Sequence, residues 1–356
     1  MINTVKEVWK LNPTKFPKKI IIEENATQKI PDILKNLGDF HSILCVIGKK
    51  THEIVGKDIK KILAKDGYKP NFVFVKACDE RTIFDAQKKG LKADLIMGIG
   101  GGKNIDVAKA VASHLKIPWV SVPTIPSHDG IASDRSVVSK GKTKYPVLGN
   151  PPIAVIADTT IIAKAPFRYF AAGCGDVISK ITAVLDWQLA RNEKGESYDD
   201  YAANLAYSSA EIIIKNAKNY RKDFESSIKI LMKCLINCGI AMLITKSSRP
   251  CSGSEHMFCH TVDKSFPENK ALHGEKVALG TYIMSYLHGI YHEEIKNALI
   301  SYKLPTNSKQ IKIPSRILVE VLSTAHKIRS DMRYTILRNG IDKKDARNIL
   351  KKLKVI

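Results

Sequence analysis

The sequence predicts an α/β N-terminal domain built on a parallel sheet, followed by an all-α C-terminal domain. Short apolar runs alternate regularly with helical patterns through the first half of the 356-residue chain. Strand signals stop after about Pro166, and the rest of the chain carries helical periodicity. A chain of this length can bury two hydrophobic cores. We therefore expect two domains, 1–163 and 164–356.

Each predicted strand is a short apolar run bounded by turn residues. The helices between the strands are predicted by apolar residues spaced three and four positions apart, as for Ile105, Ala108 and Val111. Strands that alternate with helices form parallel sheets covered on both faces. The predicted strands are 43–47, 71–75, 94–99, 118–122 and 153–157, and the helices among them are 53–66, 81–89 and 105–115.

The second half of the chain is predicted to be helical. The N-terminus of the chain lacks the apolar core of a signal peptide. No run in the chain approaches the length of a membrane span, about 18 apolar residues. We therefore expect a cytoplasmic protein with no membrane span. The seven cysteines form no regular framework and are expected to be reduced. The predicted C-terminal helices are 174–192, 201–216, 228–244, 276–287, 292–301, 316–328 and 343–354.

The chain is strongly basic, with 57 Lys and Arg against 35 Asp and Glu and a net charge of +22. These cations are spread thinly, and no basic stretch is interleaved with aromatic side chains as a nucleic-acid stacking surface requires. We expect no specific nucleic-acid partner, and a positive field that attracts phosphates and nucleotides. A membrane or nucleic-acid binder that uses the basic helix 343–354 remains an alternative.

A glycine-rich turn joins the predicted strand 94–99 to the helix 105–115, with the sequence Gly98-Ile99-Gly100-Gly101-Gly102-Lys103-Asn104. Glycines let the backbone approach a pyrophosphate, whose charge the next helix N-terminus stabilises. The usual dinucleotide fingerprint is not met, because Lys103 stands at its third glycine position, and the Walker spacing is also absent. A Rossmann-like cofactor loop is expected, and a glycine turn without a ligand is the alternative.

Polar residues follow the next predicted strand, in Pro123-Thr124-Ile125-Pro126-Ser127-His128-Asp129-Gly130 and then Ser133. The carboxyl ends of parallel strands are where doubly wound sheets bind ligands. An ordinary turn with local hydrogen bonds is the alternative.

The end of the first predicted strand bears on cofactor choice. An acidic residue after an early strand favours NAD, whereas basic residues accommodate the phosphate of NADP. Here Gly48 is followed by Lys49, Lys50, Thr51 and His52, without a carboxylate. We expect the protein to accept NADPH.

Three histidines lie close together in the sequence. His256 and His260 are four residues apart, on one face of a helix, and His273 follows seventeen residues after His256. Histidine is the commonest protein ligand of zinc-class metals. Met257 stands where zinc proteases carry their catalytic Glu, so a metal here would act as a Lewis acid on a substrate oxygen. Asp176, after a small-residue turn, is the candidate for the missing ligand; a helix-capping Asp and surface histidines are the alternative.

These motifs, in their order along the chain, resemble those of the iron-dependent alcohol dehydrogenase superfamily, which includes glycerol dehydrogenase and 3-dehydroquinate synthase. Within it, residues 124–133 and 254–260 are most similar to the archaeal sn-glycerol-1-phosphate dehydrogenases. The motifs are Gly100-Gly101-Gly102 with Asp106 and Lys109, Pro123-Thr124 with Ser127, Gly173-Cys174-Gly175-Asp176, His256 with His260, and His273-Gly274-Glu275-Lys276.

The resemblance implies NAD(P)H-dependent, zinc-assisted reduction of dihydroxyacetone phosphate to sn-glycerol 1-phosphate, the backbone of archaeal membrane lipids, by a homo-oligomer. A glycerol dehydrogenase, another metal-dependent alcohol dehydrogenase, or a dehydroquinate synthase-like lyase is the alternative. By the same resemblance, Asp176, His256 and His273 hold the zinc ion. Asp129, Asp176 and His260 face the substrate and serve in catalysis, with His260 as proton donor directly or through a water. The implied cofactor-binding residues are Gly100, Gly101, Gly102, Lys103, Asn104, Ile105, Asp106, Thr124, Ile125, Pro126, Ser127 and Ser133.

Overall fold

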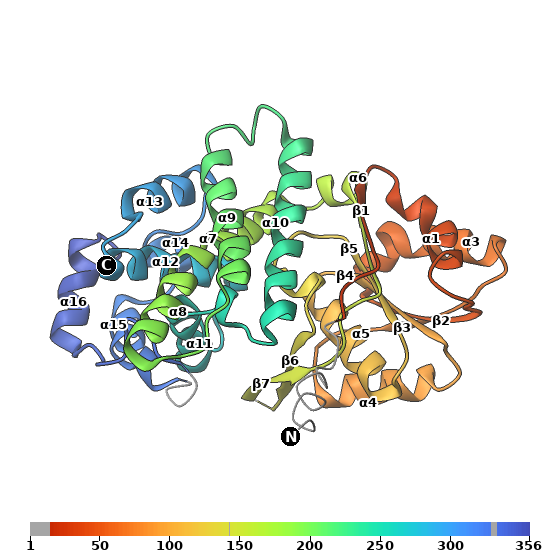
Figure 1. Cartoon of the computed structure of the whole chain (residues 1–356), viewed down its shortest axis with the longest axis horizontal. Helices are drawn as coiled ribbons and strands as arrows, with labels where there is room; N and C mark the ends of the chain where they lie inside the picture. The colour runs from red at the N-terminus through yellow and green to blue at the C-terminus, as the bar shows by residue number, and fades with distance from the viewer. Residues whose placement is uncertain (1–14, 142, 329–332) are drawn as a thin grey trace, which may run out of the picture.

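A six-stranded parallel sheet with the strand order β1-β8-β5-β4-β2-β3 forms the N-terminal half of the protein (Figure 1). The computed structural model describes residues 15–141, 143–328 and 333–356, so the signal-peptide prediction, which rests on the first residues, lies outside them. The five predicted strands are all present, each within two residues of its expected bounds. The strands are β1 (Lys19–Glu23), β2 (Ser42–Ile47), β3 (Lys69–Phe74), β4 (Leu95–Gly100), β5 (Trp119–Pro123) and β8 (Ala154–Asp158).

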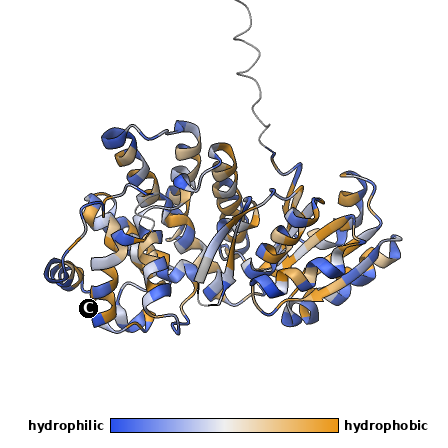
Figure 2. Cartoon of the chain, turned by 90° about the horizontal axis from the view of Figure 1, so that it is seen from below, coloured by the Kyte–Doolittle hydropathy of each residue, from blue (hydrophilic) through white to orange (hydrophobic). Residues whose placement is uncertain are grey.

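Helices cover both faces of the sheet, as the alternating pattern predicts. In β2, Ile43, Cys45 and Ile47 pack into the hydrophobic cluster under one helical layer, whereas Leu44 and Val46 pack under the other. In Figure 2 the strands are mostly apolar and the outer turns of the helices are hydrophilic. One layer contains α1 (Ile30–Lys35) and α3 (Lys57–Lys65), and the other α4 (Glu80–Gly90) and α5 (Gly102–Leu115).

Three strands were not predicted. β1 has an apolar run of only three residues but pairs with β8 along its whole length. The antiparallel pair β6 (Arg135–Lys140) and β7 (Thr143–Leu148) forms a separate two-stranded sheet between β5 and β8 in the chain. β6 has only two adjacent apolar residues, Val137 and Val138, and Pro146 interrupts β7, so neither strand has the uninterrupted apolar run that predicted the others.

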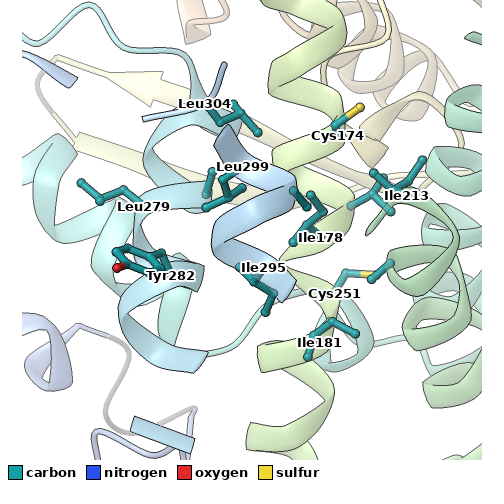
Figure 3. Packing of buried hydrophobic residues seen from close by; sticks show 14 of the residues in the cluster. Cys174, Ile178, Ile181, Ile213, Cys251, Leu279, Tyr282, Ile295, Leu299 and Leu304 are labelled. Carbon is teal, nitrogen blue, oxygen red and sulfur yellow. The ribbon is translucent and has the colours of Figure 1, made fainter. Parts of the chain in front are cut away.

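The second half is helical, and its helices surround one large hydrophobic core (Figure 3). One predicted helix, 174–192, was wrong: this stretch belongs to two helices that meet at Ser179. The first of them begins earlier than predicted, directly after Pro166. The helices are α6 (Thr159–Ala163), α7 (Phe167–Ile178), α8 (Lys180–Lys194), α9 (Asp200–Asn216), α10 (Phe224–Thr245), α11 (Ser254–Ser265), α12 (His273–His288), α13 (His292–Ser301), α14 (Ser308–Ile311), α15 (Ser315–Thr324) and α16 (Lys343–Lys352).

The sequence predicted no segment apolar enough for a membrane span, and helix α10 is an exception by length and composition. Among the described residues it is the one helix that meets this test by length and composition, with a mean hydropathy of 1.8. It packs against α9 and α7, and Leu231, Leu235 and Cys238 are buried in the core. Its apolar surface is therefore used inside the fold, and we interpret it as a core helix. The seven cysteines, all among the described residues, are free thiols.

The strand order reverses at β2, whose neighbours are β3 on one side and β4 on the other. In doubly wound sheets the crevice at such a reversal, outside the carboxyl ends of the strands, is the usual ligand site. β2 is followed by Gly48 and β4 ends at Gly100. The glycine-rich turn and the polar residues after β5 therefore lie side by side beyond the carboxyl ends of the parallel strands.

Candidate active site

Asp176, His256 and His273 come together from three different helices of the second half. Their ligand atoms all lie within 4.8 Å of one another. Asp176 Oδ1 is 3.7 Å from His256 Nε2 and 3.7 Å from His273 Nε2. Asp176 and His256 are buried, while the His273 side chain is 41% exposed, so the cluster opens to solvent on one side. One carboxylate and two imidazoles with an open side fit a catalytic zinc-class metal held by three protein ligands.

Glycines bring two of these helices into backbone contact. A Cβ on Gly274 of α12 would overlap the carbonyl oxygen of Ala172 on α7, and a Cβ on Gly175 would lie 2.6 Å from the carbonyl oxygen of Gly274. Any side chain at these positions would separate α7 from α12. The sequence around each ligand thus sets how closely Asp176 can approach His273.

Glu255 orients His256. Glu255 is fully buried, and its Oε1 lies 2.7 Å from His256 Nδ1. The same carboxylate accepts hydrogen bonds from the Gly253 N–H at 2.7 Å and the Thr182 hydroxyl at 2.9 Å. Burial, with the charge of Lys180, lowers the pKa of His256 to about 3, so the imidazole is neutral near pH 7. A neutral imidazole whose second nitrogen is held by a carboxylate is the form that binds metals.

Lys180 was not predicted, and it is the buried cation of the site. Its Nζ lies 2.9 Å from Asp129 Oδ2 and 3.2 Å from Asp176 Oδ1. Burial opposes the charged form, but the two carboxylates outweigh it and raise the pKa of Lys180 well above its usual value. Burial also opposes ionisation of Asp176, yet Lys180 and His256 hold the pKa of Asp176 below its ordinary value. The i,i+4 spacing from Asp176 was the available sequence signal.

Asp129, predicted to face the substrate, lies against the metal-binding cluster. Its backbone N–H donates to Asp176 Oδ2 at 3.0 Å, and its carboxylate is 18% exposed. His260 lies one helical turn beyond His256, with 6.3 Å between the ring centroids, and is partly buried. His260 is outside the three-donor cluster. Both residues therefore lie beside the cluster.

Two ion pairs fix α12, which carries His273. Arg168 on α7 makes a bidentate pair with Glu275, at 2.5 Å from Nε to Oε1 and 2.6 Å from Nη2 to Oε2. Glu275 Oε2 also accepts the Leu272 N–H at 2.7 Å, which caps the helix. The next residue, Lys276, pairs with Asp263 of α11. These contacts connect α12 to α7 and to α11, the two other helices that carry ligands.

The glycine loop forms a tight cradle at the start of α5. Gly100 has φ 136°, a conformation that favours glycine, and Gly101 precedes the first helical residue. A Cβ on Gly101 would lie 2.5 Å from Ile125, and Cβ atoms on Gly100 and Gly102 would overlap Asn104 and His128. Asn104 Nδ2 donates to the Ile99 carbonyl at 2.8 Å, while its buried Oδ1 has no partner among the described residues. A loop without side chains at a helix N-terminus fits a pyrophosphate.

The remaining predicted cofactor residues differ in how a ligand could reach them. The Thr124 N–H donates to the Gly100 carbonyl at 3.1 Å, which holds the two loops together. Ile105 is buried in the core, so only its backbone can face a ligand. Asp106 Oδ2 accepts the Val137 N–H at 3.2 Å. Ser133 is buried, and its hydroxyl accepts from Lys109 Nζ at 3.4 Å.

Other residues of this set contact the rest of the fold or solvent. Lys103 Nζ donates to the Lys76 carbonyl at 2.8 Å. A Cβ on Gly173 of α7 would overlap the carbonyl oxygen of Pro126, so the loop after β5 touches the helix that carries Asp176. Ser127 is partly exposed beside this contact. The loop after β5 therefore spans from the glycine cradle to the metal-binding cluster.

The comparisons with known proteins first identify the fold as that of the alcohol dehydrogenases described as iron-containing. The family profile described as iron-containing alcohol dehydrogenase matches residues 21–166. Among solved structures, glycerol dehydrogenase from Schizosaccharomyces pombe has the same fold, with a TM-score of 0.78 and 19% identity over 95% of this chain and 89% of that one. Maleylacetate reductase from Agrobacterium tumefaciens has a TM-score of 0.76 and 15% identity over 95% of this chain and 96% of that one.

Sequence relatives narrow the class to one family. The chain is 40% identical over 344 residues, 96% of each chain, to "Glycerol-1-phosphate dehydrogenase [NAD(P)+]" of Methanosarcina mazei. It is 42% identical over 342 residues, 94% of this chain and 97% of the other, to the protein of that name from Pyrococcus furiosus. The chain belongs to the glycerol-1-phosphate dehydrogenase family and is an oxidoreductase. The predicted fold class and resemblance are thus confirmed.

Proposed function

We propose that the protein reduces dihydroxyacetone phosphate to sn-glycerol 1-phosphate with NAD(P)H and a zinc ion, in the cytoplasm, as a source of archaeal lipid backbones. The observation that carries this proposal is the donor cluster of Asp176, His256 and His273, which is linked to the glycine cradle by the loop after β5. Relatives at about 40% identity over nearly the whole chain support the substrate and the cofactor. In this proposal, residues 1–163 bind the dinucleotide and residues 164–356 bind the metal and substrate.

When bound, the zinc ion would polarise the ketone of the substrate, and the reduced nicotinamide would supply the hydride. Asp176, His256 and His273 hold the metal, and Glu255 keeps His256 oriented. Lys180 pairs with both Asp129 and Asp176 and so offsets part of the repulsion between the two neighbouring carboxylates. His260 is the proton donor to the reduced oxygen, directly or through a water, because imidazole titrates near neutral pH.

For the cofactor, we propose that NADPH is used at least comparably to NADH. β2 is followed by Lys49 and Lys50, which are exposed and would accommodate an added phosphate. His52 follows these lysines in the same helical segment and packs edge-on against Phe72 and Phe74, with 5.2 Å between ring centroids in each pair.

The test is NADPH oxidation with dihydroxyacetone phosphate before and after chelation, with chiral identification of the product. A glycerol dehydrogenase would prefer the unphosphorylated ketone; this alternative is tested because a glycerol dehydrogenase shares the fold. A dehydroquinate synthase-like lyase would show no net NADPH consumption. A binder that depends only on the basic surface would be indifferent to chelation and to His256→Ala.

A further inference from the structure

His128 lies at the junction between the glycine cradle and the metal-binding cluster. Its imidazole is held between two glycines: a Cβ on Gly130 would lie 2.5 Å from Cε1, and a Cβ on Gly102 would overlap Nε2. The next residue, Asp129, donates its backbone N–H to Asp176 Oδ2 at 3.0 Å. His128 therefore contacts the first turn of α5, and the next residue contacts a carboxylate of the metal-binding cluster.

The hydrogen bonding of the ring defines its neutral tautomer. His128 Nδ1 accepts the backbone N–H of Gly130 at 2.9 Å. Since Nδ1 is an acceptor, the proton of the neutral imidazole is on Nε2. Nε2 is against Gly102, the first residue of α5, and within the described part of the chain it has no hydrogen-bond acceptor. An N–H donor therefore stands beside a helix N-terminus that already attracts anions.

A turn cap alone does not explain a histidine at this position. Capping the Gly130 N–H needs only one acceptor atom, which Asn, Asp or Ser provides with a shorter side chain. Histidine adds a second polar atom on the far side of the ring, and the two neighbouring glycines leave room for that ring. The second nitrogen, Nε2, is therefore what distinguishes histidine from a simple cap at this position.

We propose that the Nε2–H of His128 donates a hydrogen bond to a phosphate oxygen of a ligand in this cleft. This inference rests on the proposed function, which supplies two sources of that chemistry: the cofactor pyrophosphate and the phosphate of dihydroxyacetone phosphate. His128 is thus a binding residue for an anion.

Two substitutions separate the two nitrogens of the ring. His128→Asn keeps an acceptor at the place of Nδ1 but has no donor at Nε2, whereas His128→Gln places an amide N–H toward Nε2 and weakens the cap. The measurements are the Kd of NADPH without substrate, the KM of dihydroxyacetone phosphate, and kcat/KM with unphosphorylated dihydroxyacetone. We expect His128→Asn to weaken phosphate-dependent binding by about 10- to 100-fold, as for one hydrogen bond to a charged group, and His128→Gln to retain most of it.

The two sources give different patterns. A rise confined to the Kd of NADPH assigns the donor to the pyrophosphate. A rise in the KM of dihydroxyacetone phosphate, with kcat/KM for dihydroxyacetone unchanged, assigns it to the substrate phosphate. Wild-type values in His128→Asn, equal losses in both variants, or a loss only in His128→Gln would each overturn the proposal, the last because the residue would then be a cap.

Thermal unfolding of each variant shows whether it folds. If His128→Asn does not fold, His128→Asp keeps the cap and sets a carboxylate against the phosphate, so binding should fall further; wild-type binding in that variant overturns the proposal. A wild-type protein that fails to oxidise NADPH with dihydroxyacetone phosphate refutes the proposed function instead, and the NADPH titration still tests His128.

Discussion

Removing the buried charge of Lys180 should destabilise the metal-free protein far more than the metal-loaded protein. Lys180 Nζ lies 2.9 Å from one carboxylate oxygen of Asp129 and 3.2 Å from one of Asp176, all three groups being largely buried. At an effective dielectric constant of about 20, each attraction is worth roughly 5–6 kcal/mol before the cost of desolvation. Breaking a buried pair typically leaves a net loss of about 3–5 kcal/mol. We expect a loss of that size in metal-free Lys180→Met.

A divalent cation on Asp176 supplies positive charge next to the same carboxylates. The loss of stability in Lys180→Met should therefore be smaller when zinc is bound, and Lys180→Arg, which keeps the charge, should lose less than Lys180→Met in either state. The measurement is chemical denaturation of wild type and both variants after chelation and after addition of zinc. An equal loss for Lys180→Met in both states, or a metal-free loss of less than about 1 kcal/mol, would refute the electrostatic role given to Lys180.

Four further predictions follow from the site. His260→Ala should keep its metal and its affinity for NADPH while kcat falls by about 10²–10⁴-fold, as for a lost general acid; a variant that loses its metal would make His260 a ligand. Glu275→Gln should lower metal affinity by about 10- to 100-fold because it frees the helix of His273 from Arg168, and unchanged zinc affinity in a competition titration with a chelator would contradict this. Lys50→Asp should shift the ratio of kcat/KM values toward NADH, and a wild-type preference for NADH of about 100-fold or more would refute the role given to the lysines after β2. The pKa of His256 is lowered to about 3 in the folded protein, so below the ordinary pKa near 6.5 only the unfolded chain takes up a proton at this residue. The stability of the metal-free protein should therefore fall as the pH drops from about 6.5 to 3, by up to roughly 1.4 kcal/mol per pH unit. A metal-free His256→Gln variant with the same pH dependence of unfolding would contradict this.

Much of the fold could be predicted because its signals are local. Each of the five predicted strands contains a short apolar run: β2, β4, β5 and β8 lie in the interior of the sheet, and β3 lies at one edge. The edge strand β1 has an apolar run of only three residues, β6 has only two adjacent apolar residues, and Pro146 interrupts β7, so these strands lack that signal. The break at Ser179 was missed because the helical pattern continues on both sides of it.

The candidate site divides in the same way. Asp176, His256 and His273 have residue types that indicate metal binding, and the structure brings their donor atoms together. The residues that position them were not predicted. Lys180, Glu255 and the ion pairs of α12 depend on contacts between helices, and a buried Lys or Glu has no mark in the sequence that separates it from the many exposed ones in a chain of net charge +22. Their roles depend on the three-dimensional packing.

In the proposed function, a metal held by Asp176, His256 and His273 supports the reduction of dihydroxyacetone phosphate. The most direct measurement is the rate of NADPH oxidation with this substrate as zinc is returned to the chelated protein, for wild type and for His256→Ala and His273→Ala. Wild-type activity should rise with bound zinc and saturate near one ion per chain, while the two variants should neither retain zinc nor recover activity. Oxidation that persists without metal, or zinc content unchanged in both variants, would contradict it.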